Sequence, residues 1–147
     1  MLHKLEALHE ATRAALWDME ELTRASIPDR ARLSTVRWKL TSLTTKRLRL
    51  IELEIYPALL PAAQPEERAA LEQLAADRRE RRQMSADHIE RWSLERALTD
   101  WEGYRKASAA IRSDALAKLN REREVLIPLL QRLEHASPGS SAGAPRR

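Results

Sequence analysis

The sequence contains no cysteine, no phenylalanine and only three glycines among its 147 residues. Without cysteine the chain can form no disulfide and no thiolate metal site, and it has no thiol nucleophile. This composition suits a reducing cytoplasm, where we expect the protein to work. The scarcity of glycine, together with many Ala, Leu, Arg and Glu residues, favours helix.

Long apolar runs are absent as well. Charged residues make up 33% of the chain, and no window reaches the roughly 18 apolar residues of a transmembrane helix. The N-terminal stretch carries acidic residues throughout and has no apolar signal-peptide core. The net charge is +4, but acids and bases are interleaved. We therefore expect no membrane partner, and the diffuse charge argues against a nucleic-acid partner.

No catalytic constellation can be assembled from the sequence. There is no phosphate-binding loop, no serine has a histidine at a recognisable offset, and the carboxylates are spread too evenly to single out an acid–base pair. We therefore predict that the protein is not an enzyme.

The spacing of apolar residues predicts four helices, at about 2–25, 30–56, 66–98 and from 99 onward. Prolines separate the first three, and Thr99 and Glu102 have the spacing of a capping box. Long helices with short connectors predict an all-α, antiparallel up-down-up-down four-helix bundle over residues 1–135. Residues 136–147, "ASPGSSAGAPRR", have the composition of a disordered tail.

Two of these predicted helices end alike, with "EIYPALL" at 54–60 and "EVLIPLL" at 124–130. These segments resemble the ends of the second and fourth helices of the hemerythrin-like (HHE cation-binding) family. His9 in "ALHEATRAAL" resembles the histidine of the family's first helix. His88 in "MSADHIERW" resembles the second histidine of its third helix. The resemblance implies a four-helix bundle whose histidines and bridging carboxylates hold two iron ions.

The sequence departs from this family pattern at most ligand positions, so we interpret it as a divergent member that lacks most iron ligands. The positions that the resemblance implies form a polar centre, which consists of His9, Arg47 (or Leu48), Glu52 (or Ile51), Met84, His88, Lys118 and Glu122. Arg47 and Lys118 have replaced histidines, and a cation repels the metal ion it replaces.

Two interpretations of the polar centre follow. In the favoured one, Arg47 and Lys118 form an ion-pair network with Glu122 and the two histidines, and no cofactor is expected. The alternative is one weak site for iron or another divalent metal, at low occupancy, with His9, His88 and Glu122 as ligands. A small-ligand pocket also stays open.

Three functions remain open in turn. The favoured one is a non-enzymatic interaction or regulatory protein, which binds an unknown protein partner or a second copy of itself. The alternative is a metal-binding or oxygen-sensing protein with an atypical site. A third is an enzyme that uses the polar centre on a small substrate. Fold alone does not decide among them.

Three further sequence patterns are assigned to the fold and not to a binding site. We predict that "DRRERRQM" at 77–84 is a solvated helix face rather than a phosphate site. Hydroxyl residues are frequent between 34 and 45, and some should bond back to helix carbonyls. With no phenylalanine in the chain, the tryptophans should be its core aromatics, and they are Trp17, Trp38, Trp92 and Trp101.

Overall fold

The computed structural model describes residues 1–136, and all regular structure in this range is helical. The elements are α1 (Leu2–Arg24), α2 (Arg30–Leu50), the π-helix η1 (Ile51–Ile55), α3 (Tyr56–Leu59), the 3-10 helix η2 (Leu60–Ala62), α4 (Pro65–Arg91), α5 (Leu94–Thr99) and α6 (Trp101–Ala136). The all-α prediction is therefore confirmed for this range. None of these helices is long and apolar enough to cross a membrane. The predicted tail, apart from Ala136, lies outside the described residues.

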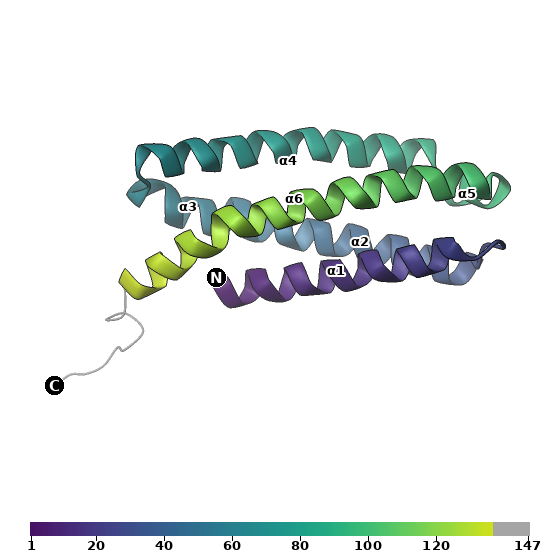
Figure 1. Ribbon diagram of the computed structural model, residues 1–147, viewed down its shortest axis with the longest axis horizontal. Helices are drawn as coiled ribbons and strands as arrows, with labels where there is room; N and C mark the ends of the chain where they lie inside the picture. The colour runs from purple at the N-terminus through teal and green to yellow at the C-terminus, as the bar shows by residue number, and fades with distance from the viewer. Residues whose placement is uncertain (137–147) are drawn as a thin grey trace.

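The long helices α1, α2, α4 and α6 run lengthwise, and the chain direction alternates from each to the next (Figure 1). Helix α1 packs against α2 and α6, and α4 packs against α6. The N-terminus lies at the same end of the molecule as the end of α6 (Figure 1), where the Met1 amino group is 3.9 Å from the Glu134 carboxylate.

Polar side chains cap the N-terminal ends of α2 and α4 by accepting hydrogen bonds from backbone N–H groups. The Asp29 side chain accepts a hydrogen bond from the Arg32 N–H (3.1 Å) at the start of α2. Pro65 begins α4, and acidic residues occupy its first turn. There Glu67 accepts from the Gln64 N–H at 2.8 Å.

The predicted end of the second helix at Tyr56 is wrong, because the helical path continues through Pro57 to Leu59. A wide turn makes this possible. In η1 the Tyr56 N–H donates to the Ile51 carbonyl, five residues back. Pro57 has no N–H, and in a regular α-helix its ring clashes with the carbonyl four residues earlier. The π-turn accommodates this proline without ending the helix.

The predicted boundary between the third and fourth helices is also wrong. Helix α4 ends at Arg91, and Ser93 caps the short α5 by accepting from the Arg96 N–H (3.1 Å). Helix α6 then begins behind Asp100, whose carboxylate accepts from the Gly103 N–H at 3.1 Å. The Asp100 cap therefore displaces the predicted Thr99 cap. A Cβ at position 103 would overlap the Asp100 carboxylate and Trp92, which explains the glycine.

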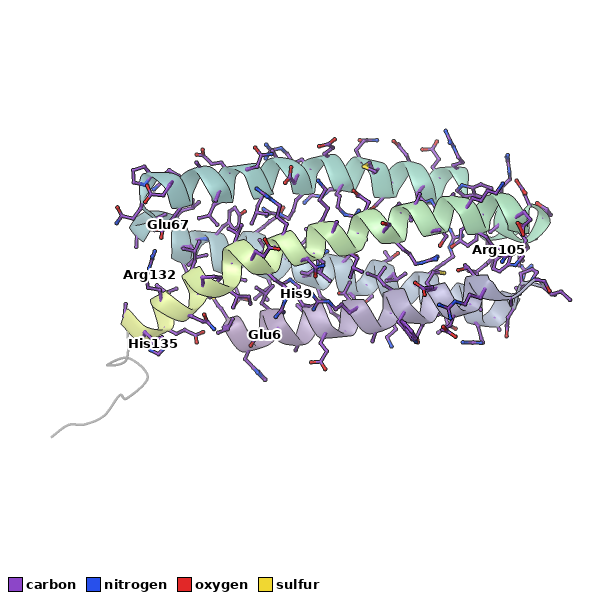
Figure 2. All side chains as sticks on the ribbon, in the orientation of Figure 1. Glu6, His9, Glu67, Arg105, Arg132 and His135 are labelled. Atoms are coloured by element: carbon purple, nitrogen blue, oxygen red, sulfur yellow. The ribbon has the colours of Figure 1, made fainter. Side chains whose placement is uncertain are left out.

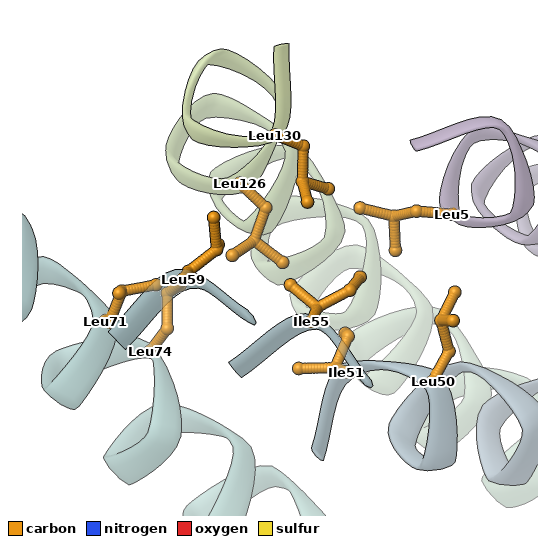
Figure 3. Packing of buried hydrophobic residues seen from close by; sticks show 9 residues of the cluster. All are labelled: Leu5, Leu50, Ile51, Ile55, Leu59, Leu71, Leu74, Leu126 and Leu130. Carbon is orange, nitrogen blue, oxygen red and sulfur yellow. The ribbon is translucent and has the colours of Figure 1, made fainter. Parts of the chain in front are cut away.

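Two apolar clusters fill the interior at opposite ends of α1 and α6. The first, drawn in Figure 3, consists of Leu5, Leu50, Ile51, Ile55, Leu59, Leu71, Leu74, Leu126 and Leu130. The second consists of Met19, Leu22, Leu33, Val36, Trp92, Ala97, Trp101 and Tyr104. Along both helices, buried polar residues lie between the two clusters.

The tryptophan prediction is half right. Trp92 and Trp101 are buried in the second cluster. Trp17 on α1 and Trp38 on α2 are instead 60% and 74% exposed. Because indole carries a large apolar area, these two side chains call for an explanation other than core packing.

Candidate functional site

A buried hydrogen-bonded network joins α1, α2 and α6 between the two apolar clusters. The Nε2 atom of His9 is 2.6 Å from Oε1 of Glu122. The Nη1 group of Arg47 donates to both Glu122 oxygens, at 3.0 and 2.9 Å. His9 is 0% and Glu122 4% exposed. Three residues of the polar centre therefore meet in a water-poor interior, where charge-assisted hydrogen bonds are strong.

The neighbours of His9 fix its tautomer. Figure 2 shows this side chain between α1 and α6. Nη1 of Arg123 lies 3.4 Å from Nδ1 of His9. A guanidinium group can only donate, so Nδ1 is the acceptor and the ring proton sits on Nε2. His9 thus donates from Nε2 to Glu122.

Opposing effects act on the Glu122 carboxyl. Its burial raises the pKa, but the hydrogen bond from His9 and the charge of Arg47 outweigh that effect and hold the pKa below its ordinary value. Glu122 is therefore a buried carboxylate, kept ionised by its partners.

The remaining residues of the polar centre make no hydrogen bond to this network among the described residues. Lys118 is half-buried and lines a cleft beside Arg47 and Glu122, but has no ion pair within residues 1–136. Met84 is 42% exposed. Glu52 is exposed and pairs with Arg82 at 2.8 Å. Of the two registers considered, Arg47 and not Leu48 reaches Glu122, while Ile51 faces the interior in place of Glu52.

His88 belongs to a different environment. Its ring centroid is 5.9 Å from that of Tyr104, in the second apolar cluster. Burial and the positive charge of Arg37 lower the pKa of His88. This histidine is therefore held neutral by its surroundings, and no hydrogen bond joins it to the His9 network among the described residues.

These side chains do not fit a di-iron centre. Within residues 1–136 no three His, Cys, Asp or Glu side chains come close enough to hold a metal ion. His9, His88 and Glu122 therefore do not form a ligand set. Both Glu122 oxygens are occupied by Arg47 and His9, and the free nitrogen of His9 faces the Arg123 guanidinium. Guanidinium groups oppose the binding of a cation here.

The prediction of a solvated face at 77–84 is wrong for Arg78 and Arg81, which are half-buried, whereas Arg82 is exposed as predicted. Arg78 donates to the Tyr56 hydroxyl at 2.9 Å, Arg81 pairs with Asp114 at 2.6 Å, and Arg82 pairs with Glu52. Each contact joins α4 to another helical segment. No local spacing announces these partners, because each lies at least 22 residues away in the sequence.

The exposed side of α2 is the second unusual feature. Residues at steps of three and four form an uncharged stripe, which consists of Ala31, Ser34, Thr35, Trp38, Thr41, Ser42 and Thr45. All are exposed except Ser42, which is half-buried. In a chain with 33% charged residues, a helix face without charge is unexpected.

Three of the five hydroxyl groups on this uncharged stripe bond to the backbone of their own helix. Thr35, Thr41 and Thr45 donate to the carbonyls four residues earlier, at 3.0, 3.1 and 3.0 Å. The prediction that hydroxyls bond back to helix carbonyls is confirmed. The methyl groups of these three threonines lie on the exposed side of the helix. The stripe is therefore less polar than its composition implies.

No protein-family model, no curated protein and no solved structure matches this chain. The features of this chain that bear on its function are the buried network and the exposed surface.

Proposed function

We propose that the chain is a degenerate hemerythrin-like protein, an antiparallel four-helix bundle without a di-iron centre. It acts through protein interaction and not through catalysis. The two proline-ended segments of the sequence support the family. The Arg47–Glu122–His9 network supports the loss of the metal centre, because two of its members occupy the family's ligand positions while a guanidinium group occupies a third.

The observation that carries the interaction role is the uncharged stripe of α2, with Trp38 74% exposed at its middle. Tryptophan is enriched among the residues that dominate binding energy in interfaces. The first partner to test is a second copy of this chain. The molecule has a net charge of +4, so two copies repel through their charged surfaces, whereas an uncharged stripe meets itself across a two-fold axis without that penalty.

Replacing Trp38 by serine should weaken self-association by about 30-fold or more, the loss expected for an interface hot spot. The measurement is light scattering coupled to size-exclusion chromatography over a range of protein concentrations. Trp17→Ser is the matched control, because Trp17 is 60% exposed but lies on α1 outside the uncharged stripe. A wild-type chain that stays monomeric throughout, or equal losses in both variants, would rule out this dimer.

Offering the protein ferrous iron under anaerobic conditions and then admitting air as the oxidant should give no stoichiometric binding, no ferric charge-transfer band and no shift in melting temperature. The physical reason is that Arg47 and Arg123 already occupy the directions from which Glu122 and His9 would approach a metal. Elemental analysis with UV–visible spectroscopy provides the measurement. Near-stoichiometric iron with such a band would favour the metal-binding or oxygen-sensing alternative.

A further inference from the structure

A cleft between α2, α4 and α6 is lined by an excess of positive charge, and it encloses about 100 Å³. Among the described residues that line it, the cations are Arg47, Arg78, Arg81, Arg82, Lys118 and Arg121, and the carboxylates are Asp77 and Glu122. Asp114 and Glu52, which pair with two of these arginines, still leave two more cations than anions. The cleft is therefore electropositive.

Arg78 is one of three cleft cations, with Lys118 and Arg121, that have no carboxylate partner among the described residues. Its Nη1 donates to the Tyr56 hydroxyl at 2.9 Å, and its guanidinium carbon lies 4.5 Å from the centroid of the same ring. Within residues 1–136 it has no carboxylate partner, and its Nε group is buried and reaches no acceptor. Because the Nε atom exposes almost no surface, a ligand in the cleft would meet Arg78 through its Nη2 group, which makes no hydrogen bond among the described residues.

Arg47, which lines the cleft from α2, differs from Arg78 in having a carboxylate partner. Its Nη1 is engaged by Glu122, but its Nε group is likewise buried without an acceptor among the described residues. The Glu122 charge is already balanced by Arg47 and screened by the His9 hydrogen bond. The one buried carboxylate of the cleft therefore opposes an incoming anion only weakly.

We infer that this cleft binds a small tetrahedral oxyanion, either free inorganic phosphate or the phosphate group of a small metabolite. Such a group presents several acceptor oxygens in directions that match guanidinium donors. A cavity of about 10–15 Å³ holds one water molecule. The cleft, with a volume of about 100 Å³ measured in the same way, is large enough for a phosphate group. This site requires neither a metal nor a dimer, so it is independent of the interaction role.

Isothermal titration calorimetry with inorganic phosphate, at ionic strength held constant with sodium chloride, tests the site. The wild-type chain should bind one phosphate saturably. Arg78→Gln should weaken that affinity about tenfold or more, the loss expected for one charge-assisted hydrogen bond. Arg79→Gln is the matched control, because it removes the same charge from an adjacent exposed residue that does not line the cleft, and should leave the affinity unchanged.

Titration with glycerol phosphate distinguishes the two candidate ligands, free inorganic phosphate and the phosphate group of a small metabolite. Tighter binding than inorganic phosphate indicates a phosphorylated metabolite, and equal or weaker binding indicates the free ion. No saturable heat with wild-type protein, or an equal loss in the Arg78 and Arg79 variants, would overturn the site. If circular dichroism shows Arg78→Gln to be unfolded, the half-buried Lys118 replaces it, and an unchanged affinity in Lys118→Gln would overturn the inference as well.

Discussion

Replacing Glu122 by alanine should lower the free energy of unfolding by about 3–5 kcal/mol, the cost of removing one partner from a buried ion pair. The variant leaves the Arg47 side chain, which is only 12% exposed, without its carboxylate. It also leaves the fully buried His9 without the acceptor of its Nε2 proton. Urea unfolding at neutral pH, followed by circular dichroism, measures the loss.

The same variant should change the response to acid. Because the folded-state pKa of Glu122 lies below its ordinary value, the unfolded chain takes up a proton on this residue before the folded chain does. The stability that Glu122 contributes is therefore complete above its ordinary pKa and is lost as the pH falls through the folded-state value. Wild-type protein should lose more stability than Glu122→Ala over that range.

A triple apolar variant is the control for this interpretation. Changing His9 and Glu122 to leucine and Arg47 to methionine removes all three polar groups at once, so the half-buried Arg123 alone loses a contact, the long one to His9. This variant should be at least as stable as wild type, since replacing buried ion pairs with apolar groups is often neutral or stabilising by about 1–4 kcal/mol. A loss below about 1 kcal/mol in Glu122→Ala would contradict this interpretation. That result would mean that water reaches the network and weakens its ion pair to the strength of an exposed one.

Replacing Tyr104 by alanine should cost about 3–5 kcal/mol, the range for a large aromatic side chain removed from a core. Tyr104 is 1% exposed. Its ring lies edge-on to Trp92 and stacks on Trp101, with both centroids 5.7 Å away. It also contacts the ring of His88. Alanine would leave a cavity at this position, and Trp92 and Trp101 would each lose an aromatic neighbour.

Tyr104→Phe separates the ring from its hydroxyl. The hydroxyl donates to the Met19 sulfur at a long 3.8 Å. Burial raises the pKa of Tyr104, and Arg37 and Ser108 lie close enough to oppose that rise without a short hydrogen bond to the hydroxyl. The phenylalanine variant should therefore lose less than about 1 kcal/mol. Thermal and urea unfolding of the two variants provide the comparison. Equal losses in both would place the stabilisation in the hydroxyl and contradict the packing argument.

The spacing of apolar residues predicted the long helical segments, because leucine and isoleucine recur at the helical period along a buried face. The sequence also located two members of the buried network, His9 and Glu122, through the helix motifs around them. The register of the second helix stayed open between Arg47 and Leu48. The π-turn at Ile51–Ile55 explains the ambiguity, since it adds a residue to one turn and shifts every count made backward from Pro57.

Other features depended on contacts that no local pattern records. His88 lies at a helical spacing that suits either a ligand or a core residue, and only its approach to Tyr104 distinguishes them. Arg78 and Arg81 are part of a mixed-charge run that is typical of a solvated face. Their partners, Tyr56 and Asp114, come from segments that approach only in the folded chain.

The buried network also has a consequence for the order of folding. His9 and Glu122 are separated by 113 residues, whereas α1 and α2 are joined by a short connection and pack on each other. Contacts between distant segments carry the larger loop-closure cost and form after local ones. Glu122 should therefore bond to His9 after the rate-limiting barrier is crossed. Its removal then accelerates unfolding and leaves the refolding rate nearly unchanged, so this ion network sets how long the native state lasts.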